Sequence, residues 1–201
     1  MRGESGNSVE RLDVSVMFCD IRDFAQFAAE KDPEYVAEFL NSFYSSMVEI
    51  IFHHSGSLDK FIGDGFLAVF SAPGEPELHA KSAIAAAVAM REAVDELNSL
   101  RRRRNELSIR IGTGIHSGEV IAGSIGSEQR MDYTVVGAAV NYAARIEGLN
   151  KRLNTDILIS EETFGRVRSS IRAERFDSVP IRGLRKPATI YRVIELIRDT
   201  V

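Results

Sequence analysis

Residues 58–73 read LDKFIGDGFLAVFSAP, with two short apolar runs on either side of Gly63-Asp64-Gly65. Apolar runs rich in Phe, Ile and Val around such a centre predict a tight hairpin of two buried strands, with the Asp64 carboxylate at its turn. Because the two glycines permit positive φ and close approach of a ligand, that carboxylate suits a hard cation such as Mg²⁺. The alternative is a turn whose residues serve backbone geometry alone.

The composition is that of one globular domain. The chain has 201 residues, of which 44% are apolar and 27% charged, as is ordinary for a globular protein. A net charge of −4 argues against a surface built mainly for nucleic acid, so we expect no nucleic-acid partner. One cysteine, Cys19, excludes an internal disulfide, and no apolar run reaches the length of a membrane span.

The N-terminal segment differs from the rest of the chain. Residues 1–11 are polar and lack hydrophobic periodicity, so we interpret them as a linker or an expression remnant. Residues 12–197 then form the globular domain. We expect this domain to be cytoplasmic and to be the cytosolic part of a longer membrane-tethered or multidomain protein.

Hydrophobic periodicity predicts alternating strands and helices. It places strands at 14–20, 133–136, 157–160 and on both sides of 182–187, and helices at 24–30, 33–54, 78–101 and 138–149. Residues 107–125 are predicted as a strand pair with its turn at 117–119, and residues 101–104 as a solvated helix end. This order indicates an α+β fold, a largely antiparallel sheet with helices on one face, whose first six elements match a ferredoxin-like βαββαβ core followed by additional C-terminal strands and helices.

In such a core, the first and third strands are neighbours. Asp20 ends the first strand and Asp64 lies at the hairpin tip, so their carboxylates are expected to meet although they lie far apart in sequence. Two converging carboxylates are typical of two-metal phosphoryl or nucleotidyl transfer. Backbone N–H groups at Asp23-Phe24, where a helix begins, would face a phosphate chain. The alternative is a helix cap and a turn aspartate that are unrelated.

A second candidate pair is Asn141 and Arg145. Four residues apart on a predicted helix, they share one face. Asn can orient a ribose oxygen, and Arg can neutralise an anion that develops at phosphorus. Taken alone, such a pair is more often solvated surface.

Four sequence blocks together resemble the catalytic domain of class III adenylate (adenylyl) cyclases. The blocks are FCDIRDF at 18–24, KFIGD at 60–64, YTVVG at 133–137 and VNYAAR at 140–145. All four occur in the order and spacing of that family, over residues 14–194. The resemblance implies the class III nucleotidyl cyclase fold and conversion of ATP to 3′,5′-cyclic AMP and pyrophosphate.

The resemblance also implies roles for single residues. Asp20 and Asp64 match the family's metal-binding aspartates, with the Ile21 carbonyl as a further ligand for two Mg²⁺ or Mn²⁺ ions per active site. Lys60 matches the lysine that accepts adenine, where guanylate cyclases carry Glu, and Thr134 matches its base-selecting partner. This Lys/Thr pairing resembles a subgroup that is commonly stimulated by bicarbonate.

The same resemblance implies a shared active site. Asn141 matches the ribose-orienting residue, and Arg145 the residue that stabilises the transition state at the α-phosphate. In this family the metal aspartates come from one chain and the base, ribose and transition-state residues from the other. A head-to-tail homodimer of this chain would then hold two equivalent sites.

The sequence departs from the family at several positions, two of which bear on substrate and metal binding. Asp23 stands where Gly is usual, and we expect its side chain to point to solvent. Leu184 stands where the family often has a Lys for the terminal phosphates, so Arg130, Arg185 and Lys186 become candidates for that role.

Three other functions compete with an adenylate cyclase. The first is a guanylate or dual-specificity cyclase, against which Lys60 argues more clearly than Thr134, since a hydroxyl can donate or accept. The second is a catalytically silent, nucleotide-binding regulatory module. The third is a diguanylate cyclase or polymerase-palm relative, although Gly63-Asp64-Gly65 lacks the Gly-Gly-Asp/Glu-Glu-Phe signature of such cyclases.

Overall fold

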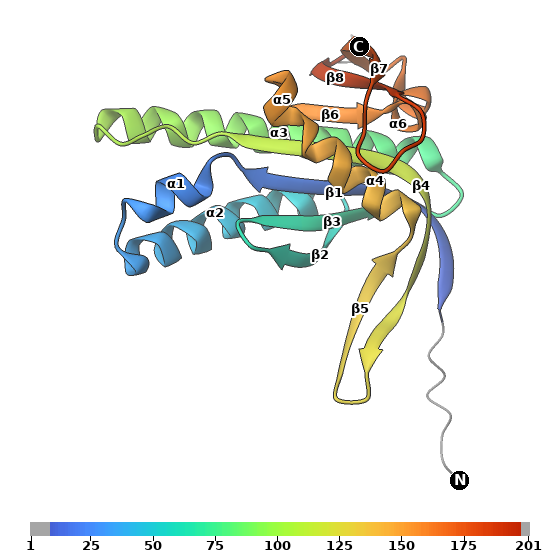
Figure 1. The fold of residues 1–201 in the computed structure, drawn as a ribbon, viewed down its shortest axis with the longest axis horizontal. Helices are drawn as coiled ribbons and strands as arrows, with labels where there is room; N and C mark the ends of the chain where they lie inside the picture. Colours follow the sequence, from blue (N-terminus) through green and yellow to red (C-terminus); the bar gives the residue numbers. More distant parts are fainter. Residues whose placement is uncertain (1–8, 198–201) are drawn as a thin grey trace.

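The computed structural model describes residues 9–197, built on one twisted sheet (Figure 1). Its strands lie in the order β2-β3-β1-β4-β6-β8-β7, with β5 paired to β4 off this path. The strands are β1 (Glu10–Ile21), β2 (Gly56–Ile62), β3 (Gly65–Ser71), β4 (Ile111–Ser127), β5 (Arg130–Val136), β6 (Ile157–Ser160), β7 (Ile171–Val179) and β8 (Ala188–Leu196). The β2-β3-β1-β4 portion has the predicted ferredoxin-like order, which confirms the α+β class.

Helices cover both faces of the sheet, so the prediction of helices on one face is wrong (Figure 1). Strand β1 buries Met17 and Cys19 against α2 and α3, and Val14 and Val16 against α4, because successive side chains point to opposite faces. The helices are α1 (Phe24–Ala29), α2 (Pro33–His53), α3 (Pro76–Arg103), α4 (Ala138–Glu147), α5 (Leu149–Leu153) and α6 (Glu161–Val167).

The hairpin of β2 and β3 forms as predicted, but only β3 is buried. Strand β2 is an edge strand, and Phe61 and Ile62 each keep 47% of their surface exposed. Both strands were predicted to be buried because both are rich in apolar residues. Their burial differs because β3 has neighbours on both sides and β2 on one.

Residues 111–127 form one continuous strand, so the predicted strand pair with a turn at 117–119 is wrong. Ser117 pairs with Ser15 and Glu119 with Asp13 in the ladder between β1 and β4. Pairing with β1 holds this Ser-Gly-Glu segment extended, although its residues favour turns. The chain reverses at 128–129 instead, and β4 and β5 project from the sheet as a two-stranded arm (Figure 1).

One boundary and one side chain also differ from the predictions. Strand β1 begins at Glu10, inside the segment predicted as a linker, because its first residues pair with β4. Residues 1–8 lie outside the described part of the chain. Arg101 is buried, not solvated: its guanidinium donates to the Leu107 carbonyl (2.7 Å), pairs with Glu106 (3.1 Å) and packs over the ring of Phe27. Between residues 9 and 197, no helix is long and apolar enough to span a membrane.

Candidate functional site

The ladder between β1 and β3 brings Asp20 and Asp64 together. Asp20 lies opposite Gly65, and Asp64 precedes Gly65 in the turn between β2 and β3. A Cβ atom on Gly65 would collide with the Cys19 carbonyl and press on the Asp20 carboxylate. Glycine at position 65 therefore permits the close approach of the strand end and the hairpin tip that the sequence predicted.

The two carboxylates open into a cavity of about 490 Å³. Its floor is the end of β1, and the start of α1 and the end of α4 form its walls. The side chains and backbone that line it include Asp20, Ile21, Phe24, Asp64, Glu147 and Lys151. The predicted metal ligands and Phe24 thus share one cavity, large enough to admit part of a nucleotide.

The cavity concentrates negative charge. Burial, together with the charge of Asp64, raises the pKa of Asp20 to about 6. Burial, and then the charge of Asp20, raises the pKa of Glu147 to about 7, against an opposing effect of Arg22. Such crowded carboxylates favour a bound cation, which would relieve their repulsion.

The donor set fits Mg²⁺ or Mn²⁺. Within residues 9–197, no three or more His, Cys, Asp and Glu side chains are grouped to hold a metal by themselves. Asp20 and Asp64 would therefore supply two carboxylates, and main-chain oxygen, water and substrate phosphates the remainder. Mg²⁺ is usually bound in this way, through one or two carboxylates plus phosphate oxygens.

Asp23 is exposed, as predicted, and its carboxylate is also paired with two cations. Its backbone is left-handed (φ 56°), which explains why glycine suits this position and why Asp tolerates it. The Asp23 carboxylate accepts a hydrogen bond from Lys151 (2.6 Å) and lies 3.7 Å from Arg110. The bond from Lys151 and its charge lower the pKa of Asp23. These contacts tie the loop after β1 to α5.

Asn141 and Arg145 lie on the exposed face of α4 and do not line the cavity. Ala143 and Ile146, on the other face, are buried against the sheet. The Arg145 guanidinium packs beside Gly183, in the loop before β8. In one chain, the predicted catalytic pair is therefore separated from the predicted metal ligands.

Lys60 and Thr134 come together from different strands, through a residue that the sequence did not single out. The Thr134 hydroxyl donates to Asp59 at 2.8 and 2.9 Å, and Lys60 Nζ lies 3.3 Å from the same carboxylate. Neither Lys60 nor Thr134 lines the cavity that holds Asp20 and Asp64. The predicted base-reading pair is thus assembled, but away from the metal ligands of its own chain.

The exposed cations predicted to bind the terminal phosphates lie outside the cavity. Arg130 lies at the tip of the arm of β4 and β5, where it is 84% exposed and pairs with Asp132 at 3.5 Å. Lys186 is exposed in the loop between β7 and β8. Neither contacts the carboxylate cavity of the same chain.

Comparison with known families matches residues 8–195 to the adenylate and guanylate cyclase catalytic domain. The chain belongs to this family. Adenylate cyclase 1 of Rhizobium meliloti is 31% identical over 96% of this chain, and adenylate cyclase of Anabaena cylindrica is 34% identical over 90%. The chain spans only 29% and 36% of the lengths of these two relatives.

Solved cyclase structures share the fold over nearly the whole domain. Adenylyl cyclase CyaB from P. aeruginosa superposes with a TM-score of 0.88 at 30% identity, covering 96% of this chain and 100% of that one. Guanylyl cyclase Cya2 superposes with a TM-score of 0.84 at 32% identity, covering 95% and 96%. One of these structures is named an adenylyl cyclase and the other a guanylyl cyclase, so overall similarity does not decide between ATP and GTP as the substrate.

The cyclase domain has two cavity residues that sequence reasoning missed. Glu147 lies two positions after Arg145 and therefore faces the opposite side of α4, toward Asp20 and Asp64. Lys151 enters the cavity from α5, after the helix breaks at Gly148. A helical wheel of α4 separates Glu147 from Arg145, but only the packed fold shows which face meets the cavity.

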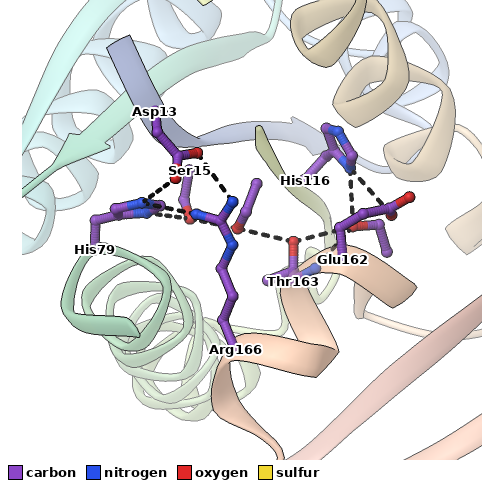
Figure 2. Close-up of polar contacts among 9 residues, drawn as sticks. Asp13, Ser15, His79, His116, Glu162, Thr163 and Arg166 are labelled. Atoms are coloured by element: carbon purple, nitrogen blue, oxygen red, sulfur yellow. Dashed lines mark hydrogen bonds and ion pairs between the residues drawn. The ribbon is translucent and has the colours of Figure 1, made fainter. Parts of the chain in front are cut away.

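A buried polar cluster joins five elements: β1, α3, β4, β6 and α6 (Figure 2). The Ser15 hydroxyl on β1 contacts His79 on α3 (2.9 Å) and Ser117 on β4 (2.7 Å), and Ser117 contacts Thr163 on α6 (3.0 Å). Thr163 also contacts Ser160 (3.1 Å), which contacts His116 at 2.9 Å. Hydroxyl groups thus form a continuous chain between two histidines.

Arg166 determines the tautomer of His79. It donates to His79 Nε2 (2.9 Å) and to Asp13 (3.0 Å), as Figure 2 shows. Arginine can only donate, so Nε2 of His79 must accept. The proton is therefore on Nδ1, which donates a hydrogen bond to the Ser15 hydroxyl. Burial lowers the pKa values of His79 and His116, so the unfolded chain binds protons more readily. The contribution of these histidines to stability is therefore lost as the pH falls below about 6.5.

Removing the central hydroxyl of the cluster tests its contribution to stability. Ser117→Ala leaves Ser15 and Thr163 each without one buried partner, so we expect the free energy of unfolding to fall by about 1–3 kcal/mol. Urea unfolding at pH 7.5 measures this change. Ser99→Ala is the matched control, because the Ser99 hydroxyl bonds to the Asp95 carbonyl on an exposed helix face. Equal effects of the two variants would contradict a stabilising role for the cluster.

The crowded carboxylates predict a stabilising substitution. The folded-state pKa of Asp20, about 6, exceeds its ordinary value of 3.8, so the folded domain loses stability as the pH rises through this interval. Asp20→Asn removes the charge, and we expect its free energy of unfolding at pH 7.5 to exceed that of the parent by about 1 kcal/mol, allowing for partial exposure. Urea unfolding without divalent cations, at pH 4 and 7.5, measures the difference. Asp95→Asn, at an exposed position of α3, should change little, and a destabilised Asp20→Asn at pH 7.5 would refute the repulsion.

Proposed function

We propose that the domain is an adenylate cyclase that converts ATP to 3′,5′-cyclic AMP and pyrophosphate at a site shared by two chains in a head-to-tail homodimer. The observation that carries this proposal is the separation of two residue sets in one chain. Asp20 and Asp64 line a cavity that Asn141 and Arg145 do not reach. Because each chain carries both sets, a symmetric pair would complete two sites.

The residues of each set suit one part of the reaction. The ribose 3′-oxygen attacks the α-phosphorus in line, forming one P–O bond while the bond to pyrophosphate breaks. Two Mg²⁺ or Mn²⁺ ions, when bound by Asp20, Asp64 and the Ile21 carbonyl, would lower the pKa of the 3′-hydroxyl and neutralise phosphate charge. Asn141 of the other chain would orient the ribose, and Arg145 would stabilise negative charge that develops on the α-phosphate oxygens.

The remaining substrate contacts follow the resemblance to the family and the charges of the side chains. Lys60 would donate to adenine N1, with Thr134 beside it, which favours ATP over GTP. The backbone N–H at Phe24 would bind phosphate oxygens. Arg130 and Lys186 are exposed cations available for the terminal phosphates. A guanylate or dual-specificity cyclase is the second candidate function, because Cya2 is named a guanylyl cyclase.

Bicarbonate stimulation and a cytoplasmic location stay predictions. The first follows from the Lys60 and Thr134 pairing, and we expect cyclic AMP formation to rise when bicarbonate is added at constant pH and ionic strength. Initial rates with bicarbonate and with an equal concentration of chloride measure the effect. Equal rates in the two salts would remove this prediction.

Mixing inactive variants tests the shared site. Asp20→Ala and Arg145→Ala should each form no cyclic AMP, because each damages both sites of its own homodimer. An equimolar mixture should recover about a quarter of the wild-type activity, since half of the dimers are hybrids with one intact site. Product is measured with ATP and with GTP, each with Mg²⁺ or Mn²⁺.

The control and the contrary outcomes are distinct. Asp20→Ala mixed with Asp64→Ala should stay inactive, because both substitutions lie in the same half of every site. No recovery in the first mixture would refute the shared site, and cyclic GMP as the main product would refute the adenine assignment. Nucleotide binding without any product would favour a silent regulatory module.

A further inference from the structure

Asp59 occupies a β-bulge in the edge strand β2. In the ladder between β2 and β3, Leu58 faces Ala68 and Lys60 faces Leu67, so Asp59 is the extra residue without a partner. A bulge re-aims the side chain of its extra residue. The Asp59 side chain is only 5% exposed, whereas that of Lys60 is 42% exposed. The bulge thus turns a carboxylate inward that a regular edge strand would leave in solvent.

The Asp59 carboxylate receives three donors. The Thr134 hydroxyl donates at 2.8 and 2.9 Å, the Val135 backbone N–H at 3.2 Å, and Lys60 Nζ lies 3.3 Å away. Strands β2 and β5 do not pair with each other in the described sheet, so this carboxylate bridges two otherwise unpaired strands. A buried carboxylate is stable only when it is paired in such a way.

These contacts determine whether the Thr134 hydroxyl can donate a hydrogen bond to a ligand or accept one from it. A threonine hydroxyl has one proton and two lone pairs, and an ionised carboxylate only accepts. The hydroxyl proton is therefore directed to Asp59, and Thr134 presents only lone pairs to a ligand. Lys60 has only donors. The pair thus presents one acceptor and one donor in a defined order.

Adenine and guanine differ in that order. Adenine has a donor at its 6-amino group and an acceptor at N1, whereas guanine has an acceptor at O6 and a donor at N1. With Thr134 facing position 6 and Lys60 facing position 1, adenine is complementary. Guanine would set acceptor against acceptor and donor against donor. A freely rotating Thr134 hydroxyl could instead donate to O6, which would admit guanine.

We propose that Asp59 is a specificity-determining residue, which selects adenine by holding the Thr134 hydroxyl as an acceptor and Lys60 beside it. This inference rests on the proposed function, because that function makes Lys60 and Thr134 the base-binding pair. Asp59 is a positioning residue, since it acts through Thr134 and Lys60 and not by contact with the base.

Asp59→Asn tests the proposal with little change in size. The amide nitrogen can donate to Thr134, which frees the hydroxyl proton for a ligand. We expect the ratio of kcat/KM for ATP to kcat/KM for GTP to fall about tenfold, partly through a gain in GTP turnover. With Thr134→Val as background, the same substitution should change the ratio by no more than about twofold, because the hydroxyl is already absent.

Asp177→Asn is the matched control. The Asp177 carboxylate also accepts a threonine hydroxyl, from Thr189 at 3.2 Å, and it lies on β7 outside the base-binding pair. This variant should leave the ratio unchanged. An unchanged ratio in folded Asp59→Asn, or a full effect in the Thr134→Val background, would overturn the proposal. If Asp59→Asn fails to fold, Asp59→Ser, which also removes the charge, is judged by the same ratio.

A binding measurement separates this inference from the proposed function. Calorimetry with 3′-deoxy-ATP and 3′-deoxy-GTP, which cannot cyclise, reports base preference without turnover. If the wild type forms no cyclic nucleotide, the proposed function fails, yet a preference for 3′-deoxy-ATP that Asp59→Asn reduces about tenfold supports Asp59. No preference, or one that is unchanged in the variant, overturns it. If the wild type is active and its selectivity is unchanged in the variant, only the inference fails.

Discussion

The antiparallel ladder between β1 and β3 is the constraint on which the site depends. It places Asp20 opposite Gly65, and therefore beside Asp64, although the two aspartates are far apart in the chain. Burial, and then repulsion by Asp64, raise the pKa of Asp20, so the folded domain carries a local electrostatic cost at neutral pH. Core packing of β1 on both of its faces holds the carboxylates in place despite this cost. Such strain is common where a protein is arranged to receive a cation.

Tertiary contacts of side chains arrange the remainder of the domain. The cluster around Ser15 and Ser117 joins β1 and β4 to α3 and α6. Asp59 likewise joins β2 to β5, two strands that are not paired with each other in the sheet. In both places a buried polar group is fully paired, and no buried side-chain nitrogen or oxygen in residues 9–197 lacks a partner. Satisfied polar groups of this kind define one arrangement among several that apolar packing would allow.

Local sequence patterns predicted the strands and helices themselves more reliably than the burial and the partners of their residues. The hairpin at 58–71 and the helix that begins at Pro33 were both predicted from a few neighbouring residues. The turn expected at 117–119 was wrong because β1 pairs across it, and the solvated Arg101 was wrong because Glu106 and two aromatic rings surround it. The turn error arises from a strand far away in the sequence, and the Arg101 error arises partly from the distant rings of Phe27 and Phe39.

By itself, the sequence determined most of the strands and helices and their order, the α+β class and the family, because periodicity and four spaced motifs are properties of the chain alone. It also identified Asp20 and Asp64 as a pair, since the topology of a βαββαβ core brings those strand ends together. Only the tertiary structure decided that Asn141 and Arg145 lie away from that pair and that Glu147 faces it. It also decided that a β-bulge turns Asp59 toward Thr134. These placements depend on which helix and strand faces pack together and on where the register of a ladder shifts by one residue.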